Sequence, residues 1–377
     1  MPISKDYFID WNQSRNVFPV DHYLPSQMPN MTSSQVMNET ILTIAIPTYN
    51  RPRQLAETLR IILPQLENEP RVKVLILDNC SQIPVLAVLA SIHAKQNEQI
   101  NVIRHSLNIG GNANIIRCFE LCDTEWLWVL CDDDHPRKDA VKTILSDTEG
   151  EHLFAFYQFP QSRVPANFGD RTTGRTIHGL FEAIKYTLTP LTLLSAEVYR
   201  IGKFRDRINK GYASATIGLP HLAMVFSKLE ESGGAWLLSE RTICEYNPPA
   251  RAESWMCHVI FLGLPAGYTI FKTSKAAIDY RKCLLNLYRN MPEFLLINFI
   301  AGYGLGTSLF SSQTRVFFQM AEAAYGPSLF RYPHSWLKWK VIGLFAFFPS
   351  TFVFAVLQTC RIIGREPPHI GSALRTD

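Results

Sequence analysis

Short apolar runs alternate with stretches of helical spacing between residues 41 and 134. Each apolar run is rich in β-branched, aromatic or leucine side chains and stops at a polar residue or a proline, as buried strands do. These runs are Ile41–Ile46, Val72–Leu77, Asn101–His105 and Glu125–Leu130. The segments between them repeat apolar residues at helical intervals, and they are Gln54–Leu66, Val85–His93 and Asn112–Cys122. The alternation predicts an α/β fold whose mainly parallel central sheet is covered by helices on both faces.

The pattern is less regular after residue 140. Leu153–Phe159 predicts a strand, Leu191–Arg200 a strand or the start of a helix, and Leu219–Glu231 a helix that ends at a glycine pair. Aromatic residues are frequent between 255 and 330, and their spacing predicts helices. We therefore divide the chain into four parts, which are an irregular extension (1–40), the first half of a domain (41–140), its second half (141–250) and a helical, apolar C-terminal region (251–377).

The C-terminal region contains a candidate membrane segment at residues 336–364. Its central stretch, Val341–Cys360, has twenty residues without a charge, which is about the length needed to cross a bilayer. Tryptophan and lysine precede this stretch and arginine follows it, as at a membrane interface. Pro349 in its middle and cations on both sides favour a pair of helices lying in the interface. A buried pair of core helices is the alternative.

Composition narrows the class of protein further. The 377 residues are 47% hydrophobic and 19% charged, which is ordinary for a globular enzyme and too apolar for a disordered chain. A net charge of +4 without a clustered basic stripe gives no reason to expect a nucleic-acid partner. The eight cysteines form no CxxC pair, and no secretory signal precedes the first strand, so we expect a cytoplasmic protein.

The sharpest chemical signal is the run Asp132-Asp133-Asp134, directly after the fourth predicted strand. In an extended segment, Asp132 and Asp134 point the same way and can converge on one ligand. Carboxylate oxygens suit Mg²⁺ or Mn²⁺, which retain open positions for phosphate oxygens. A solvated acidic turn is the alternative, but three adjacent carboxylates beside a buried strand repel one another. We therefore expect Asp132 and Asp134 to bind Mg²⁺ or Mn²⁺.

Three other polar segments follow strands or precede helices, and each has an alternative interpretation. Pro47–Arg51 (PTYNR) offers hydroxyls, an amide and a cation after the first strand, but its residues are also common in turns. Asp78 ends the second strand and can accept a hydrogen bond from a base or a ribose, or cap a helix. Asn108–Asn112 (NIGGN) places two glycines before a helix, where backbone N–H groups can approach an anion or simply form a turn.

Taken together and in this order, the four segments resemble the family 2 glycosyltransferases of GT-A fold. In that family a Pro-x-Tyr-Asn-Arg element, an aspartate for the nucleobase, an Asn-x-Gly segment and a DXD-type motif follow one another. The likeness is good over about residues 41–140 and looser over 150–250, and within the family it is greatest to bacterial O-antigen and surface-polysaccharide transferases of the abequosyltransferase-like group. The resemblance implies donor binding by Pro47, Thr48, Tyr49, Asn50, Arg51, Asp78, Asn108, Gly111, Asn112, Asp132 and Asp133. It also implies that Asp134 acts in catalysis through the metal.

The catalytic base departs from the family pattern. The family usually offers an acidic pair at the start of a later helix, where this chain has Pro220-His221. A histidine at the first turn of a helix can take a hydroxyl proton in its neutral form, so His221 is the candidate base or acceptor contact. A structural histidine is the alternative interpretation, and Asp206 is a second candidate base.

These features predict an inverting, metal-dependent glycosyltransferase, with inversion implied by the resemblance. It would move a hexose or deoxyhexose from a nucleotide-sugar to a saccharide acceptor, lipid-linked because the C-terminal region is apolar. We expect it at the cytoplasmic face of the inner membrane, peripheral or monotopic, in O-antigen-like polysaccharide synthesis. A nucleotidyltransferase is one alternative, although Pro47–Arg51 lacks the glycines of its usual loop. A non-catalytic sugar-binding or assembly subunit of a membrane complex is the other.

Overall fold

The computed structural model describes residues 40–93, 98–157, 175–187, 194–218, 220–239, 241–245, 263–290 and 337. All of them belong to a compact unit that begins at Thr40. The predicted extension before that residue, and most of the predicted membrane segment, lie outside the described residues.

The first half of the domain has the strands and helices that the sequence predicts. Its strands are β1 (Leu42–Thr48), β2 (Val72–Asp78), β3 (Ile100–Arg104) and β4 (Trp126–Val129). The helices between them are α1 (Pro52–Ile62), α2 (Val85–Ser91) and α3 (Gly111–Leu121). β1 lies between β2 and β4 and runs parallel to both, with Thr48 opposite Asp78 and Ala45 opposite Val129. This register brings the polar residues at the strand ends to one edge of the sheet.

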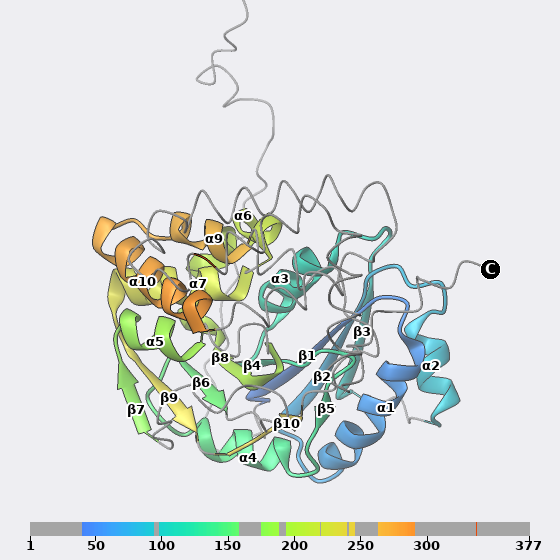
Figure 1. The fold of residues 1–377 in the computed structure, drawn as a ribbon. Helices are drawn as coiled ribbons and strands as arrows, with labels where there is room; N and C mark the ends of the chain where they lie inside the picture. Colours follow the sequence, from blue (N-terminus) through green and yellow to red (C-terminus); the bar gives the residue numbers. More distant parts are fainter. Residues whose placement is uncertain are drawn as a thin grey trace, which may run out of the picture. The chain divides into compact units, whose positions relative to one another are not determined.

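Four further strands extend the sheet to eight, in the order β3-β2-β1-β4-β8-β6-β9-β7 (Figure 1). They are β6 (Phe154–Tyr157), β7 (Arg175–His178), β8 (Glu197–Arg200) and β9 (Ala235–Ser239). β8 is antiparallel to both β4 and β6, and β7 is antiparallel to β9, whereas β6 and β9 are parallel. The α/β fold with a mainly parallel sheet is therefore confirmed, and each antiparallel pair of the sheet involves a strand of the second half.

The direction of the crossovers fixes where a ligand can bind. The chain moves outward from β1 to β2 and β3, then returns through α3 to β4 on the other side of β1. Because such crossovers are right-handed, α1 and α2 lie on one face of the sheet and α3 on the opposite face. The strand order reverses between β1 and β4. Ligands of open α/β sheets bind beyond the carboxyl ends of strands at such a reversal.

Short elements complete the domain. On the side of α1 they are η2 (Leu63–Leu66), α4 (Ala140–Asp147) and a ribbon of β5 (His135–Pro136) with β10 (Cys244–Glu245). In the second half they are α5 (Leu180–Thr187), η3 (Leu194–Ala196), η4 (Ile201–Lys203), η5 (Arg205–Arg207), α6 (Ile208–Ala213), η6 (Ala215–Ile217) and α7 (Pro220–Ser232). α3, α6 and α7 pack against one another.

Helix α7 begins and ends where the sequence predicts. Pro220 occupies its first position, where a missing N–H costs nothing. Gly233 and Gly234 follow its last turn with φ angles of 61° and 117°, which side-chain-bearing residues rarely adopt. A Cβ on Gly234 would lie 2.6 Å from Leu153, so this position also needs the absence of a side chain.

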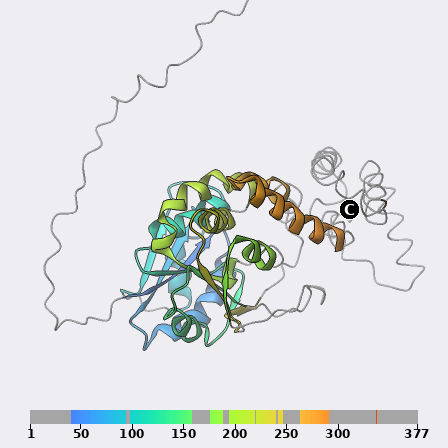
Figure 2. The ribbon, with the colours of Figure 1, turned by 90° about the vertical axis from the view of Figure 1, so that its left-hand side faces the viewer.

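The described part of the C-terminal region is helical, as predicted. It contains α9 (Leu264–Ala266), η8 (Gly267–Ile270) and α10 (Ser274–Asn290), and in Figure 2 the far end of α10 projects away from the sheet. Among the described residues no helix has the length and apolarity needed to cross a bilayer. The candidate membrane segment is described only at Leu337, whose side chain is exposed.

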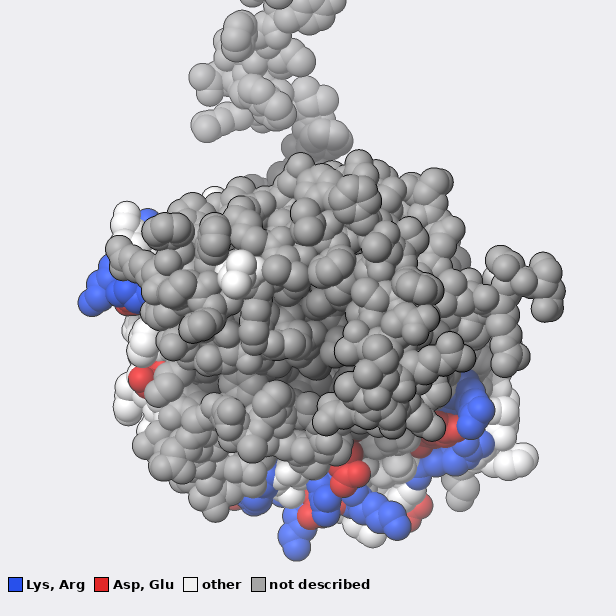
Figure 3. All heavy atoms as spheres, viewed as in Figure 1, with Lys and Arg blue, Asp and Glu red and all other residues white. Residues whose placement is uncertain are grey.

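Charged side chains on the face shown in Figure 3 are mixed in sign. Positive and negative groups alternate along the visible rim, and no large area of one sign stands out among the described residues. Oppositely charged side chains also pair directly among the described residues, as Arg53 does with Glu57 and Arg137 with Glu245.

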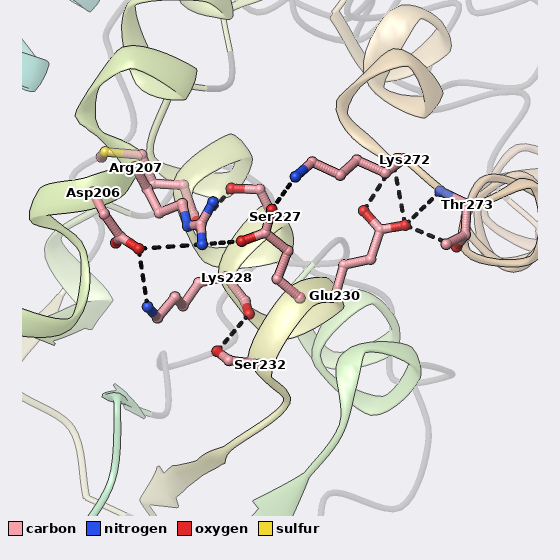
Figure 4. A network of polar contacts seen from close by, with 10 residues as sticks. Asp206, Arg207, Ser227, Lys228, Glu230, Ser232, Lys272 and Thr273 are labelled. Atoms are coloured by element: carbon pink, nitrogen blue, oxygen red, sulfur yellow. Dashed lines mark hydrogen bonds and ion pairs between the residues drawn. The ribbon is translucent and has the colours of Figure 1, made fainter.

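A carboxylate of α7 holds the start of α10. Oε1 of Glu230 accepts hydrogen bonds from the backbone N–H (2.7 Å) and the hydroxyl (2.8 Å) of Thr273, and Oε2 accepts one from the N–H of Lys272 (2.9 Å; Figure 4). Glu231, the next residue, pairs with both Lys272 and Arg207. Unpaired N–H groups at a helix start are thus satisfied by a side chain from another helix.

We expect Glu230→Ala to lower the free energy of unfolding by roughly 0.5–1.5 kcal/mol, the net contribution of a hydrogen bond, because Glu230 no longer holds Thr273, whose hydroxyl accepts the Ala276 N–H in the first turn of α10. Urea unfolding of the full chain measures it. Glu57→Ala is the matched control because Glu57 forms only an exposed pair with Arg53 one turn away on α1, a contact worth a few tenths of a kcal/mol. Equal losses in the two variants would contradict the capping role.

Candidate active site

A cavity of about 490 Å³ opens at the carboxyl ends of β1 and β4. Nine of the predicted site residues line it, namely Pro47, Thr48, Tyr49, Arg51, Gly111, Asn112, Asp132, Asp133 and His221. Asn79, Asn114, Ile115, Cys131, Leu194, Gly218 and Pro220 complete its walls. Asn50, Asp78, Asn108 and Asp134 are the predicted residues that do not line it. The volume is in the range of small-molecule sites.

The turn after β1 is tied to the acidic run after β4. The Thr48 hydroxyl donates to Oδ2 of Asp132 at 2.6 Å. Nη1 of Arg51 donates to Oδ1 of Asp132 at 3.1 Å and to Oδ2 of Asp133 at 2.7 Å. These bonds join residues more than eighty positions apart in the sequence, and they are possible because β1 and β4 are neighbours in the sheet.

Asn50 connects the same turn to the loop after β2. It adopts a positive φ of 55°, a conformation that asparagine tolerates better than most residues. Its N–H donates to the Ser81 hydroxyl at 2.9 Å, and its side-chain oxygen accepts from the N–H of Gln82 at 2.7 Å. In this structure Asn50 thus shapes two loops around the cavity, and donor contact by this residue stays a prediction.

The acidic run forms a turn, which corrects the geometry assumed from the sequence. β4 ends at Val129, and the Asp134 N–H donates back to the Cys131 carbonyl at 3.3 Å. The alternation of an extended strand therefore does not apply, and the binding of one metal by Asp132 together with Asp134 stays a prediction. One carboxylate oxygen each of Asp133 and Asp134 lies within 4.8 Å of the other and of the Cys131 Sγ. Asp132 instead faces Thr48 and Arg51.

Hydrogen bonds reduce the repulsion among the three carboxylates. Oδ2 of Asp134 accepts from the Ser195 hydroxyl at 2.6 Å, and Asp132 and Asp133 share Arg51. Burial raises the pKa of Asp132 to about 6, although Arg51 and the hydroxyl of Thr48 oppose that rise. The turn therefore gathers three carboxylates whose negative charge Arg51 and the hydroxyl donors compensate in part.

The donor set of this turn fits a hard divalent cation. Asp133 lines the cavity, and an oxygen of Asp134 lies within 4.8 Å of one of its oxygens. Carboxylate oxygens are the ligands that Mg²⁺ and Mn²⁺ prefer, and these cations keep other positions open to phosphate oxygens. Burial and then the neighbouring carboxylates raise the pKa of the Cys131 thiol well above its usual value. This thiol therefore stays protonated, and a hard cation has no need of it. Asp133 and Asp134 would hold the cation, with Asp132 beside them.

Asp78 lies beneath the cavity wall, which differs from the expected contact with a base. Its side chain is fully buried. Oδ1 accepts from the Ser81 N–H at 2.8 Å, and Oδ2 accepts from Nη1 of Arg104. Both oxygens are thus engaged by the protein, and the neighbouring Asn79 is the residue that lines the cavity.

Asn108 and Asn79 hold the loop before α3. The Asn108 side-chain oxygen accepts from Nδ2 of Asn79 and from the N–H of Gly110, both at 2.8 Å, while Oδ1 of Asn79 accepts from the N–H of Ile109. Gly110 has a φ of 87°, which explains the glycine at this position. Gly111 then begins α3 at the cavity, and nothing lies within 4 Å of where its Cβ would be. The N-terminus of α3 is therefore open to an anion.

His221 faces the cavity from the first turn of α7. Only 5% of the residue is exposed, and its Nδ1 has no hydrogen-bond partner among the described residues. Burial lowers the pKa of the imidazole to about 4, so the ring is neutral near pH 7. Nδ1 has under 1 Å² of exposed surface, so this nitrogen is closed to a molecule in the cavity in this structure, and the role of His221 as the base stays a prediction.

Asp206, the second candidate base, is engaged elsewhere. Its Oδ2 pairs with Nη2 of Arg207 and with Nζ of Lys228, both at 3.2 Å, and it does not line the cavity (Figure 4). Two cations at one carboxylate oxygen favour a structural role.

Sequence reasoning missed three residues that support or adjoin the acidic turn. Ser195 supports Asp134, and the Thr58 hydroxyl donates to the backbone carbonyls of Asp132 (3.1 Å) and Asp134 (3.2 Å). Neither lies in a recognisable motif, and only the fold brings them to the turn. Cys131 was adjacent to the acidic run in the sequence, and this adjacency was the available signal.

We expect Asp78→Asn to lower the free energy of unfolding by roughly 1.5–3 kcal/mol, since a buried, charge-assisted hydrogen bond is lost. Asp123→Asn is the control, because that carboxylate is exposed and pairs only with Lys73. Urea unfolding and calorimetric titration with nucleoside diphosphates separate the possible roles. A variant of unchanged stability that binds the nucleotide more weakly would instead support a direct base contact.

Comparisons with known proteins bear on this site. Residues 43–231, half of the chain, match Glycosyl transferase family 2. Abequosyltransferase RfbV of Salmonella typhimurium is 28% identical over 101 residues, which cover 27% of this chain and only 30% of that relative.

Solved structures show the same fold. Residues 1–349 of S. aureus TarS superpose with a TM-score of 0.53 at 15% identity, over 87% of this chain and 93% of that one. The complex of the same TarS fragment with UDP-GlcNAc gives a TM-score of 0.53 at 14% identity and the same coverage. The motif order, the sheet and the family match agree, and this chain belongs to Glycosyl transferase family 2.

Proposed function

We propose that this enzyme is an inverting, metal-dependent transferase. It would move a hexose or deoxyhexose from a nucleotide-sugar to a lipid-linked saccharide during synthesis of a bacterial surface polysaccharide of the O-antigen type. The observation that carries the proposal is a single cavity lined by the acidic turn, the start of α3 and His221.

Two features of the cavity wall, the N-terminus of α3 and the guanidinium of Arg51, favour binding of the donor's diphosphate. Gly111 and Asn112 present the N-terminus of α3 to the cavity, where unpaired N–H groups and the helix dipole favour an anion. Arg51 lines the same cavity from the β1 side and already bridges two carboxylates. Its guanidinium has donors enough to contact a phosphate as well.

The acidic turn supports the metal part of the proposal. When bound, a divalent cation neutralises charge that develops on the departing nucleoside diphosphate. Asp133 and Asp134 would orient that cation, Ser195 fixes Asp134, and Thr58 holds the backbone of the turn. Mn²⁺ and Mg²⁺ both suit these oxygen ligands.

His221 is the proposed base at the acceptor side. His221 comes from α7, in the second half of the chain, and it lines the same cavity as the acidic turn. An acceptor hydroxyl bound in this cavity could therefore lie near both the imidazole and the acidic turn. The neutral imidazole could take the hydroxyl proton as the new glycosidic bond forms. A neutral ring carries its proton on one nitrogen and can accept at the other.

The relatives guide the choice of donor and acceptor. TarS is solved with UDP-GlcNAc, and RfbV is named as an abequosyltransferase. The search for substrates therefore begins with UDP-linked sugars and with saccharide acceptors. Family membership argues against the nucleotidyltransferase alternative and against a non-catalytic subunit.

The most direct test incubates the full chain with UDP-, CDP-, GDP- and dTDP-sugars and a lipid-linked saccharide. We expect one donor to be consumed with Mn²⁺ or Mg²⁺, the product to have inverted anomeric configuration by NMR, and turnover to stop with EDTA. Full turnover with EDTA would rule out metal dependence. Retention of configuration would rule out the single displacement.

His221→Ala should lower turnover by roughly 10²–10⁴-fold, the usual contribution of a general base, and leave donor binding unchanged. His178→Ala is the matched control, because His178 is exposed on β7. Turnover should fall below about pH 6 as Asp132 takes a proton and loses the charge that attracts the cation, whereas His221 stays neutral until about pH 4. The residual activity of His221→Ala should keep that acid limb. Near-normal turnover in His221→Ala would end its assignment as the base.

Membrane association rests on the sequence pattern of residues 336–364, and the proposed location is the cytoplasmic face of the inner membrane. Flotation with vesicles containing anionic lipid should recover the full chain at the top of a gradient. A chain truncated before Ser335 should stay at the bottom. Equal distribution of the two proteins would contradict the proposal.

A further inference from the structure

The side chain of Asn112 joins the start of α3 to the second half of the chain. Its Nδ2 donates a hydrogen bond of 2.7 Å to the backbone carbonyl of Ala215 in η6. The two residues are 103 positions apart in the sequence, and the bond is possible because α3 and η6 pack against each other. The sequence predicted a donor contact for Asn112, whereas in the structure its amide nitrogen binds the protein itself.

The segment that Asn112 binds leads directly into α7. Gly218 follows η6 with a left-handed φ of 75°, and α7 begins two residues later at Pro220. The Gly218 N–H donates to the same Ala215 carbonyl at 3.3 Å. Gly218, Pro220 and His221 all line the cavity, as Asn112 does. One carbonyl therefore connects Asn112 to the segment that brings His221 to the cavity.

The part of the chain before this segment is held by close packing among α3, α6 and α7 (Figure 1). A Cβ on Gly211 of α6 would lie 3.1 Å from Met224 of α7 and 3.4 Å from Ile116 of α3. Near the C-terminal end of α3, the Tyr212 hydroxyl of α6 donates to Oε2 of Glu120 at 2.7 Å. Asn112 supplies a second contact between these two parts of the fold, at the end of α3 that faces the cavity.

We propose that Asn112 is a positioning residue for the acceptor, and that its bond to Ala215 sets the place of Gly218 and His221 relative to the donor site. The inference rests on the proposed function, in which the start of α3 receives the donor diphosphate and α7 contacts the acceptor. The bond joins these two walls of one cavity. Its loss moves the acceptor wall, while the backbone N–H groups at the start of α3 stay in place. Accurate placement of reacting groups contributes strongly to catalysis.

Hydrogen exchange of the full chain, without donor or acceptor, tests the contact itself. Asn112→Ala removes the amide, and Asn112→Asp keeps its shape but offers only acceptor oxygens. Tyr212→Phe is the matched control, because it removes one hydrogen bond between α3 and α6 at a residue outside the cavity lining. Mass spectrometry of peptides covering residues 214–221 gives their protection against exchange, which reports local opening.

We expect both Asn112 variants to lower the protection of residues 214–221 by roughly 2- to 13-fold, the factor that corresponds to the net contribution of one hydrogen bond. Tyr212→Phe should leave this protection within about twofold of the wild-type value, less than the loss of a typical hydrogen bond would cause. In transfer assays of the Asn112 variants, the KM for the acceptor should rise by more than the KM for the donor, because only the acceptor wall has moved.

Unchanged protection in Asn112→Ala would overturn the proposal. A larger rise in the donor KM than in the acceptor KM would also overturn it, because Asn112 would then be a donor contact. An equal loss of protection in Tyr212→Phe would make the bond a general structural contact. Exchange is measured without turnover, so absence of glycosyl transfer would count against the proposed function and unchanged exchange against the role of Asn112.

Discussion

The arrangement of this site depends on the hydrogen bonds that compensate Asp132. Its carboxylate lies at the end of the buried strand β4, with only 4% of the residue exposed, where an isolated charge would be costly. Thr48, the last residue of β1, and Arg51, in the turn that follows, supply the donors. These bonds hold the β1 turn against the acidic turn, and so they determine the wall of the cavity where donor phosphates would lie.

The sequence predicted the first half of the fold well because its signals there are strong and local. β1 to β4 and α1 to α3 follow from apolar runs, a proline at the start of α1 and a glycine before α3. The second half was harder to predict, because β7 and β9 are short and partly exposed, and β8 follows a single helical turn at Leu194–Ala196. Their place in the sheet depends on pairing between distant segments, and no local pattern encodes it.

Motif order located the site, but it did not give the geometry of the side chains. Nine predicted residues line the cavity, because residues at the ends of parallel strands share one edge of the sheet. Asp78 was expected to contact a base, yet Arg104 and Ser81 engage both of its oxygens. The alternation of an extended strand was applied to Asp132 and Asp134, whereas the chain turns there. Such contacts come from tertiary neighbours that no spacing rule identifies.

A double-mutant cycle between Arg51 and Asp132 tests whether Arg51 compensates the buried charge of Asp132. Arg51→Met, Asp132→Asn and the double variant would be compared with the wild-type protein by urea unfolding. We expect the pair to be coupled. The sum of the changes in unfolding free energy in the two single variants should differ from the change in the double variant by about 1–3 kcal/mol, as for contacting groups in one network. Additive effects within about 0.5 kcal/mol would contradict it, because the two residues would then act independently.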